Sequence, residues 1–245
     1  MRYLVLSDIH ANLEALDAVL HSADGRWDRA LVLGDLVGYG ADPNAVVERI
    51  VALPPAAVIR GNHDKAASGV EDTANFNPAA RAAAIWTYGA LAPDHRAYLQ
   101  ALPAGPLVVD DALEICHGSP FDEDFYIFDG SDAWRALEST RSSLCFFGHT
   151  HVAVAFLRSG NLFEAVLPEN GDTPVQARNG RRLLVNPGSV GQPRDGDPRA
   201  AYAIYDSTEG VVTLRRVDYA VERAQEKIIA AGLPKALAAR LAAGR

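Results

Sequence analysis

Five short segments of the chain place metal-binding side chains directly after apolar runs. They contain five of the seven histidines, whereas His21 and His95 lie in a helical and a polar stretch and are expected to be structural. The segments are Asp8-Ile9-His10, Gly34-Asp35, Gly61-Asn62-His63-Asp64, His117-Gly118 and Gly148-His149-Thr150-His151. Carboxylate, amide and imidazole ligands without thiolates suit Mn²⁺, Fe²⁺/³⁺, Zn²⁺, Co²⁺ or Ni²⁺ better than Ca²⁺, which prefers oxygen ligands. The set is large enough to bind two metal ions.

The first sixty residues predict alternating strands and helices that position these segments. Strands are expected at Tyr3–Leu6, Leu31–Leu33 and Ala57–Ile59. Apolar spacing predicts a helix over Asn12–Ala23, and Pro43 marks the start of a helix over Asn44–Leu53. This order predicts a parallel sheet with right-handed crossovers. Functional side chains of such a sheet collect beyond the carboxyl ends of its strands, so the segments are expected to converge on one edge.

The remainder of the chain changes in character. An alanine-rich stretch, Lys65–Gln100, predicts a helical insertion over the sheet (residues 65–100). Beyond it a helix is expected at Ser131–Ser139 and strands at Leu107–Val109, Leu113–Cys116, Leu144–Phe147, Ala153–Leu157, Leu162–Val166, Arg182–Val185, Ala201–Tyr205 and Val211–Arg216. The dipeptide Asn179-Gly180 is suited to closing a hairpin. In the C-terminal helices, Leu233, Leu237 and Leu241 form a stripe expected to pack on the sheet, with a dimer contact as the alternative.

The length fits one large α/β domain or two small ones and needs no disulfide framework; a single domain over residues 1–245 is expected. The two cysteines, Cys116 and Cys145, end apolar runs, which fits buried thiols in a reducing cytoplasm. No signal sequence or membrane span is expected. The net charge of −8 argues against binding of extended nucleic acid and favours a small phosphorylated substrate at a cationic metal centre.

The five segments resemble the motifs of the calcineurin-like metallophosphoesterases, which run D-x-H, G-D-x-x, G-N-H-[DE], H and G-H-x-H. All five occur in order between residues 4 and 151. The resemblance implies a four-layer α/β/β/α sandwich, here with a helical insertion, and a metal-dependent phosphohydrolase. The stretches Ser7–Leu16 and Asn186–Arg194 resemble the small bacterial branch of the family, which includes phosphodiesterases and asymmetric dinucleoside tetraphosphate hydrolases.

The resemblance also implies a role for each residue of the motifs. Asp35 would bridge two metals, Mn or Fe being favoured, with Asp8, His10 and His151 on one and Asn62, His117 and His149 on the other. A hydroxide bridging the metals would attack phosphorus in line. His63 matches the catalytic histidine and is expected to be cationic, so that it protonates or stabilises the leaving oxygen. Asp64 is expected either to orient His63 or to cap the following helix.

Departures from relatives bear on the competing functions. Serine/threonine protein phosphatases of the superfamily carry G-D-x-x-D-R-G, whereas this chain has Gly38 and Tyr39 in place of the second aspartate and the arginine. That weakens the protein-phosphatase alternative. A third possibility, a non-catalytic scaffold with this fold, is disfavoured because no motif residue is missing.

Substrate contacts are the least specific predictions. The loop that contains Phe121, Phe125, Tyr126 and Phe128 follows His117 and is expected either to stack a base or to cap the core. The Asn186–Ser189 turn is expected to shape a strand end, and Arg194 behind it to reach phosphate. Lys65 and Arg81 are weaker candidates for contact with phosphate. The residues predicted to contact the substrate are Asn12, Tyr39, Arg60, Phe125, Tyr126 and Arg194.

Overall fold

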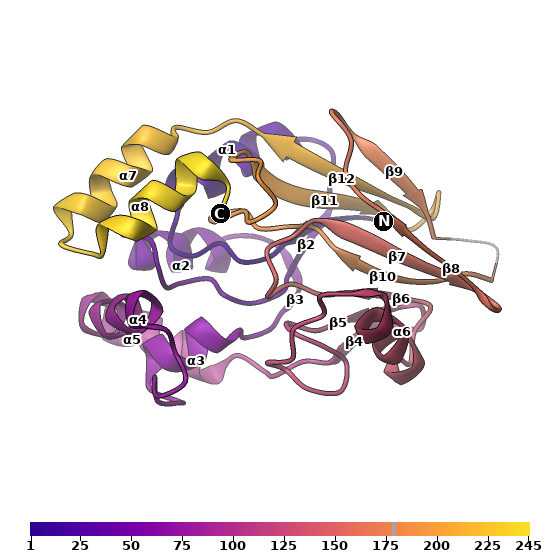
Figure 1. The fold of residues 1–245 in the computed structure, drawn as a ribbon, viewed down its shortest axis with the longest axis horizontal. Helices are drawn as coiled ribbons and strands as arrows, with labels where there is room; N and C mark the ends of the chain where they lie inside the picture. Colours follow the sequence, from indigo (N-terminus) through magenta and orange to yellow (C-terminus); the bar gives the residue numbers. More distant parts are fainter. Residues whose placement is uncertain (178–179) are drawn as a thin grey trace.

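Two six-stranded sheets pack face to face in the computed structural model, which describes residues 1–177 and 180–245 (Figure 1). The first sheet has the order β3-β2-β1-β11-β12-β9, formed by Pro55–Val58, Arg29–Val32, Arg2–Leu6, Ala200–Asp206, Val211–Val217 and Thr173–Gln176. The second has the order β4-β5-β6-β10-β7-β8, formed by Leu107–Asp110, Leu113–Ile115, Leu144–Phe146, Arg182–Asn186, Val154–Ser159 and Leu162–Val166.

Parallel pairing is confined to the strands that lead into the metal-binding segments and to β10. Strands β1, β2 and β3 pair in parallel, as predicted, and so do β5, β6 and β10 in the second sheet. The neighbouring strands β11 and β7 run antiparallel. Each sheet therefore presents the carboxyl ends of its parallel strands at one edge.

Three apolar layers hold four structural layers together. Along β1, Leu4 and Leu6 face the helices while Tyr3 and Val5 face the second sheet, because successive side chains of a strand point to opposite faces. Helices α1 (Leu13–Ala23) and α2 (Pro43–Val51) cover the first sheet, and α6 (Gly130–Ser139) covers the second. The predicted α/β/β/α sandwich is confirmed.

The remaining helices gather on the side of the molecule opposite α6 in Figure 1. The predicted helical insertion forms α3 (Asn62–Ser68), α4 (Pro78–Ala90) and α5 (Pro93–Ala101), and its first helix starts before the expected boundary. The C-terminal helices are α7 (Val221–Ala230) and α8 (Lys235–Ala243). None of the helices in the described ranges is long and apolar enough to cross a membrane.

Two predictions about the last third are wrong. No strand was expected at β9, a short edge strand that contains Pro174, because a proline weakens the strand pattern. The hairpin turn expected at Asn179-Gly180 includes Asn179, which lies outside the described residues; the flanking strands β9 and β10 pair in different sheets and not with each other.

The leucine stripe of the C-terminal helices packs on other helices and not on the sheet. Leu237 and Leu241 are buried in a cluster with Ile228 of α7, Ala83 of α4 and Tyr39. The apolar face is therefore covered within the chain, and nothing in this packing supports a dimer contact through it.

Candidate metal centre

The five metal-binding segments meet where the carboxyl ends of the parallel strands of both sheets lie side by side. Each of them follows a parallel strand: β1, β2 and β3 of the first sheet, and β5 and β6 of the second. The loops are fastened to one another by backbone bonds, such as His10 N–H to the Asp35 carbonyl at 2.9 Å and Asp8 N–H to the Gly34 carbonyl at 3.1 Å. The predicted convergence on one edge is therefore present.

One group of side chains able to hold a metal consists of Asp8, His10, Asp35 and His151, all buried. His10 Nε2 lies 3.1 Å from His151 Nε2, and His151 Nε2 lies 3.3 Å from Asp8 Oδ1. Ser7 Oγ donates to Asp8 Oδ2 at 2.6 Å, which orients this carboxylate.

A second group consists of Asp35, His117 and His149. His149 Nδ1 lies 3.1 Å from His117 Nε2, and Asn62 Oδ1 lies 3.2 Å from the same His117 nitrogen. The structure thus brings the predicted amide ligand to this group.

Asp35 lies between the two groups. Its Oδ1 accepts the backbone N–H of His63 at 2.8 Å, whereas its Oδ2 is 3.6 Å from His10 Nε2 and 3.5 Å from His117 Nε2. One carboxylate oxygen therefore faces both sets of imidazoles, as a bridging ligand must.

The hydrogen bonds of the imidazoles fit metal binding. The Nδ1–H groups of His10, His117 and His151 donate to the carbonyls of Val37, Leu33 and Gln192, and Nε2 of His149 contacts the Asp124 carbonyl at 3.1 Å. Such bonds orient metal-binding histidines and set their tautomers. With Nδ1–H donating in both rings, His10 and His151 face each other with two Nε2 lone pairs. Two acceptors so close are stable only with a cation between them.

Burial and mutual charge shift the pKa values of the group strongly. Burial lowers the pKa of His149 to about 3 and holds those of His10 and His151 well below the usual value, so these imidazoles are neutral, as metal binding requires. Burial also lowers the pKa of His117, but the Asp35 and Asp8 carboxylates outweigh it and raise that pKa to about 10. In the absence of metal, a proton on His117 offsets part of the carboxylate charge.

The backbone of the site is held in an unusual conformation. All seven non-glycine residues with positive φ in the described ranges belong to it: Asp8, His10, Ala11, Asp35, Tyr39, His149 and His151. L-residues rarely adopt this region, and such outliers cluster at functional sites.

Close packing of the loops depends on two glycines in particular. A Cβ on Gly148 would strike Ser7 Oγ, and a Cβ on Gly61 would strike the Asp35 carboxylate. The Asn186–Ser189 turn, which was expected to shape a strand end, also supports these loops: Asn186 Nδ2 donates to the Gly148 carbonyl at 2.9 Å, and Ser189 Oγ donates to the Asp8 carbonyl at 2.7 Å.

His63 is buried beside the metal groups among three rings. Its ring centroid lies 4.3 Å from Tyr39, 4.8 Å from Phe76 and 4.9 Å from His10. Burial lowers its pKa to about 4, so the expected cationic imidazole is neutral at neutral pH in the substrate-free protein. Phe76, from the segment before α4, was missed in the sequence; its position before the Asn77 cap of that helix is the only signal.

Asp64 caps α3 and does not orient His63. Its Oδ2 accepts the Gly61 N–H at 3.0 Å and its Oδ1 accepts the Val37 N–H at 3.1 Å. Nδ1 of His63 is buried without a hydrogen-bond partner among the described residues, and a Cβ on Gly38 would lie 2.6 Å from it. Of the two expected roles, the helix cap is the one the structure shows.

Arg194 extends toward the metal groups. Its Nη2 donates to Gln192 Oε1 at 2.9 Å and approaches the Tyr39 hydroxyl at 3.4 Å, while its Nε is buried without a partner. No carboxylate in the described parts of the chain forms an ion pair with it. Its positive charge lowers the pKa of Asp8, although burial dominates and raises that pKa to about 6.

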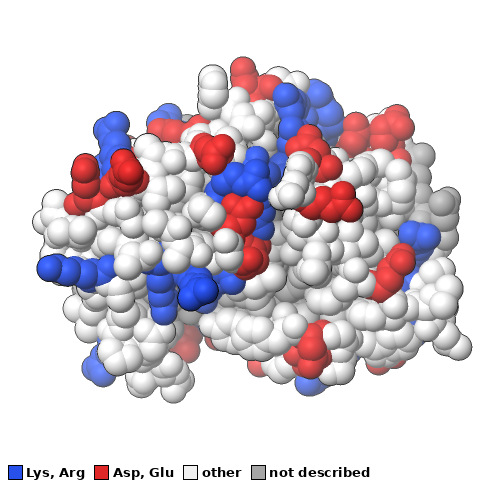
Figure 2. Space-filling view, turned by 45° about the horizontal axis from the view of Figure 1, so that its top comes forward, with Lys and Arg blue, Asp and Glu red and all other residues white. Residues whose placement is uncertain are grey.

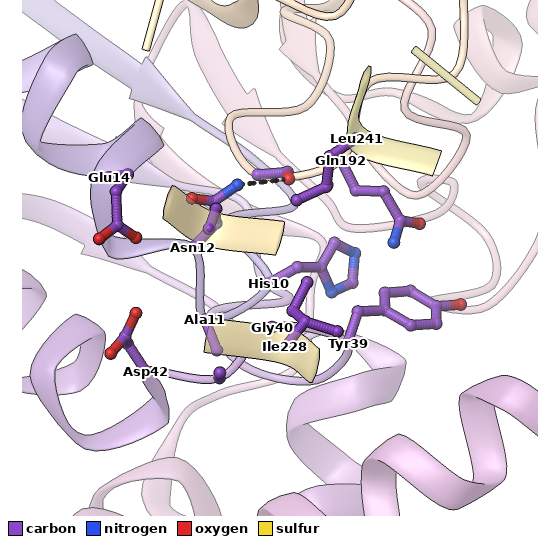
Figure 3. Close-up of a pocket in the computed structure, with 13 residues that line it drawn as sticks. His10, Ala11, Asn12, Glu14, Tyr39, Gly40, Asp42, Gln192, Ile228 and Leu241 are labelled. Carbon is purple, nitrogen blue, oxygen red and sulfur yellow. Dashed lines mark hydrogen bonds between the residues drawn. The ribbon is translucent and has the colours of Figure 1, made fainter. Parts of the chain in front are cut away.

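A small cavity of about 10 Å³ adjoins the first metal group, with His10, Asn12, Tyr39 and Gln192 around it (Figure 3). Asn12 is used structurally there. Its Oδ1 caps α1 by accepting the Ala15 N–H at 3.1 Å, and its Nδ2 donates to the Gly191 carbonyl and the Tyr219 hydroxyl. These contacts argue against the predicted substrate role of Asn12. The cavity has room for about one water molecule.

Two basic residues predicted to contact phosphate are neutralised by neighbours. Arg60 donates to both carboxylate oxygens of Glu123 at 3.0 and 3.2 Å. Lys65 is 4 % exposed and pairs with Asp124, Glu71 and Glu123 at 2.6 to 3.2 Å. Neither cation is free to bind phosphate in this arrangement, and Arg81 lies exposed on α4.

The aromatic side chains of the loop fall into two groups with different contacts. Phe121 and Phe125 pack against the α6 core beside Arg135, which is the core-capping alternative. Tyr126 instead stacks on the His149 ring at 3.7 Å, and Phe128 lies parallel to Tyr126 at 5.2 Å. Phe125 is thus turned away from the centre, whereas Tyr126 borders it.

Comparisons with known proteins agree with this geometry. The family model for the calcineurin-like phosphoesterase superfamily domain matches residues 1–210. The chain is 35% identical to an uncharacterized protein of Methanocaldococcus jannaschii, covering 98% of this chain and 97% of the relative. The protein in a crystal structure of a metallophosphoesterase from Sphaerobacter thermophilus is 41% identical to this chain. The match covers 100% of this chain and 99% of that protein's chain, with a TM-score of 0.89.

A structure described as a putative diadenosine tetraphosphatase shares the fold alone. It is 15% identical, covers 89% of this chain and 94% of its own, and has a TM-score of 0.52. The matching family model and the close metallophosphoesterase structure decide the identity. The chain belongs to the calcineurin-like phosphoesterase superfamily and is a metal-dependent phosphoesterase.

Proposed function

We propose that the protein hydrolyses phosphodiester or phosphoanhydride bonds of small substrates, such as dinucleoside polyphosphates, with two metal ions. The observation that carries the proposal is the position of Asp35 Oδ2 between two groups of imidazoles, 3.6 Å from His10 and 3.5 Å from His117. Asp8, His10 and His151 would hold one ion, Asn62, His117 and His149 the other, and Asp35 both. Mn and Fe are the favoured ions. Bound ions of this kind supply a nucleophilic hydroxide at neutral pH and neutralise phosphoryl oxygens.

The side chains around these groups supply the remaining steps. Arg194 has no carboxylate partner in the described ranges, which supports a role in binding a phosphoryl oxygen by charge-assisted hydrogen bonds. His63 is neutral and donates a hydrogen bond to the leaving oxygen, because burial lowers the pKa of its imidazole to about 4. An anionic substrate beside the ring favours the protonated form and so assists proton transfer.

A small substrate fits the site better than a phosphoprotein. The carboxylate and imidazole side chains of the two metal groups are nearly fully buried, and Tyr39 and Phe76 close around His63. Gly38 supplies no carboxylate to orient His63, in contrast to the protein phosphatases of the superfamily. On the face in Figure 2, acidic and basic side chains are interspersed and no continuous basic stripe is present, which supports the proposal that extended nucleic acid is not a partner.

We also infer a reducing cytoplasmic location. Cys116 and Cys145 are buried free thiols whose sulfurs lie 3.7 Å apart without a disulfide.

The test is hydrolysis by the Mn²⁺-loaded protein of diadenosine tetraphosphate, bis-p-nitrophenyl phosphate, p-nitrophenyl phosphate and a phosphoserine peptide. Metal content is measured on the same samples. We expect two ions per chain and the highest kcat/KM on one of the first two substrates. Preferential cleavage of the peptide would favour the protein-phosphatase alternative instead. No hydrolysis with both metals bound would favour a non-catalytic scaffold.

A further inference from the structure

An open groove of about 350 Å³ lies beside the metal centre, between the aromatic loop and the β7–β8 strand pair. Its walls and floor are formed mainly by apolar side chains, namely Ile127, Phe128, Val152, Val154, Phe156 and Leu167. Phe128 is 74% exposed and Leu167 is 64% exposed. Exposed apolar side chains gathered around one groove mark a binding site more often than scattered ones do.

A stack of rings connects the groove with the metal centre. Tyr126 lies on the ring of His149, and Phe128, which lines the groove, lies parallel to Tyr126. On the floor, Thr150 stands between His149 and His151 in the chain. The Tyr126 ring separates Phe128 from His149, with centroid spacings of 5.2 and 3.7 Å, so an ester group must be several atoms long to reach the groove from a phosphate at the metals.

Most polar groups of the groove are already engaged. Asp129 Oδ1 accepts the N–H groups of Ser131 and Asp132 at the start of α6. Thr150 Oγ1 accepts from Asn186 Nδ2 at 3.0 Å and from the Val152 N–H at 3.4 Å. Among the described residues, no lysine or arginine lines the groove. It therefore offers apolar area and one exposed ring face, and its one charged group is the Asp129 carboxylate, which repels an additional phosphate.

We propose that this groove binds an uncharged, apolar ester group of the substrate, an aryl ring or a short alkyl chain, while the phosphoryl group lies at the metals. The proposal rests on the proposed function and narrows its substrates to phosphodiesters with one hydrophobic substituent. Burial of that substituent against Phe128 and Leu167 supplies binding energy in proportion to the apolar area removed from water.

The test uses p-nitrophenyl phosphodiesters that share one leaving group and differ in the second ester: methyl, hexyl or 1-naphthylmethyl. The metal-loaded wild type is expected to favour the hexyl or naphthylmethyl ester over the methyl ester by about tenfold or more in kcat/KM. The comparison of the two large esters distinguishes an alkyl from an aryl occupant. Phe128→Ser and Leu167→Gln should each reduce that preference several-fold.

Leu162→Gln is the matched control, because Leu162 lies on β8, the strand that ends one residue before Leu167, is 78% exposed and does not line the groove. Its preference should equal that of the wild type. Methyl ester hydrolysis without a preference for larger esters, or equal loss in the control, would overturn the groove while the proposed function stands.

Direct binding decides the case in which no diester is cleaved. Calorimetry with 1-naphthylmethyl phosphonate should show several-fold weaker binding to Phe128→Ser and Leu167→Gln than to the wild type and Leu162→Gln. Unchanged binding in the groove variants refutes the site. If AMP binds as tightly as the phosphonate and is weakened by the same substitutions, the occupant is a base and the apolar assignment is wrong.

Discussion

His63 is the residue on which the proposed chemistry depends most directly, and its surroundings separate it from the ligands. The contacts of its ring are with Tyr39, Phe76 and His10, and its Nδ1 has no partner among the described residues. A side chain so placed contributes to proton transfer or hydrogen bonding, and its loss should leave the metal groups intact.

We therefore expect His63→Asn to lower kcat by about a hundredfold, in the range of lost acid–base assistance. Metal content should stay at that of the wild type, as measured by elemental analysis. His21→Asn, at an exposed histidine in α1, is the control and should change neither quantity. A variant that loses its metal along with its activity would make His63 a ligand.

Gly38 controls the position of His63 by lacking a side chain. Its φ is +90°, and a Cβ there would lie 2.6 Å from Nδ1 of His63. Gly25 has a similar φ of +69° with no atom within 4 Å of the added carbon. Alanine substitutions at Gly38 and Gly25 can therefore separate the effect of backbone strain, which both share, from displacement of the His63 imidazole, which only the first would cause.

Gly38→Ala should lower kcat/KM by about tenfold or more through displacement of His63, whereas Gly25→Ala should lower only the free energy of unfolding, by about 1 kcal/mol. Steady-state kinetics and denaturant unfolding measure the two effects. Equal kinetic losses in both variants would contradict the role given to Gly38.

At the residue scale, sequence and structure agree where the residue type itself limits the chemistry. The carboxylate, amide and imidazole residues that were assigned as ligands do come together around Asp35. The sequence could not show that Arg60 pairs with Glu123, or that Phe125 turns toward α6, because these outcomes depend on tertiary neighbours. Likewise, the neutrality of His63 follows from its burial, which no local pattern reveals.

At the scale of elements, helix α3 and the aromatic loop act as one unit. Lys65 of α3 bonds to Glu123 and Asp124 of the loop, and the Asp124 carbonyl contacts Nε2 of His149 at 3.1 Å. Burial lowers the pKa of Lys65, but its bonds to Asp124 and Glu71 raise it above the usual value overall, so the cation is retained. Lys65 thereby positions His149 through the loop.

Lys65→Met should weaken binding of one metal ion by about tenfold to a hundredfold, as expected for loss of support to a ligand. Binding of the other ion should change little. Stepwise calorimetric titration with Mn²⁺ resolves the two events. Lys235→Met, at an exposed lysine on α8, should bind both ions as the wild type does. Equal weakening of both sites in Lys65→Met would indicate general destabilisation instead.

The sequence predicts elements well where apolar patterns are long or are followed by ligands. Strands β1 and β2 have near-continuous apolar runs because both of their faces are buried, and they were expected close to their observed positions. Strand β9 was missed because four residues at a sheet edge, one of them proline, carry too little pattern. The leucine stripe was assigned to the wrong partner because periodicity identifies an apolar face without identifying what covers it.

At the scale of the whole molecule, the side chains of the candidate metal centre come from both sheets. Asp8, His10, Asp35 and Asn62 follow strands of the first sheet, and His117, His149 and His151 follow strands of the second. Ions held between these loops bind the folded state and not the unfolded chain, so they stabilise the sandwich as a unit.

Removal of metal by a chelator should therefore lower the thermal midpoint. With metal at about a thousand times its dissociation constant, the loss corresponds to about 4 kcal/mol per site. Differential scanning calorimetry before and after chelation, with Mn²⁺ added back, measures it. Asp35→Asn should show a much smaller response to chelation, because the carboxylate that we propose to bridge the ions is absent. An unchanged midpoint after verified metal removal would show that the ions do not tie the sheets together.

The seven left-handed residues of the metal centre have a consequence for protein engineering. Each costs about 1 kcal/mol relative to ordinary backbone, so together they oppose folding by an amount comparable with the net stability of a typical domain. The two sheets and their three apolar layers offset this cost. A graft of the ligand loops onto a small scaffold would lack that reserve and would relax away from the ligand geometry. The whole sandwich is therefore the smallest unit in which this centre can be transplanted.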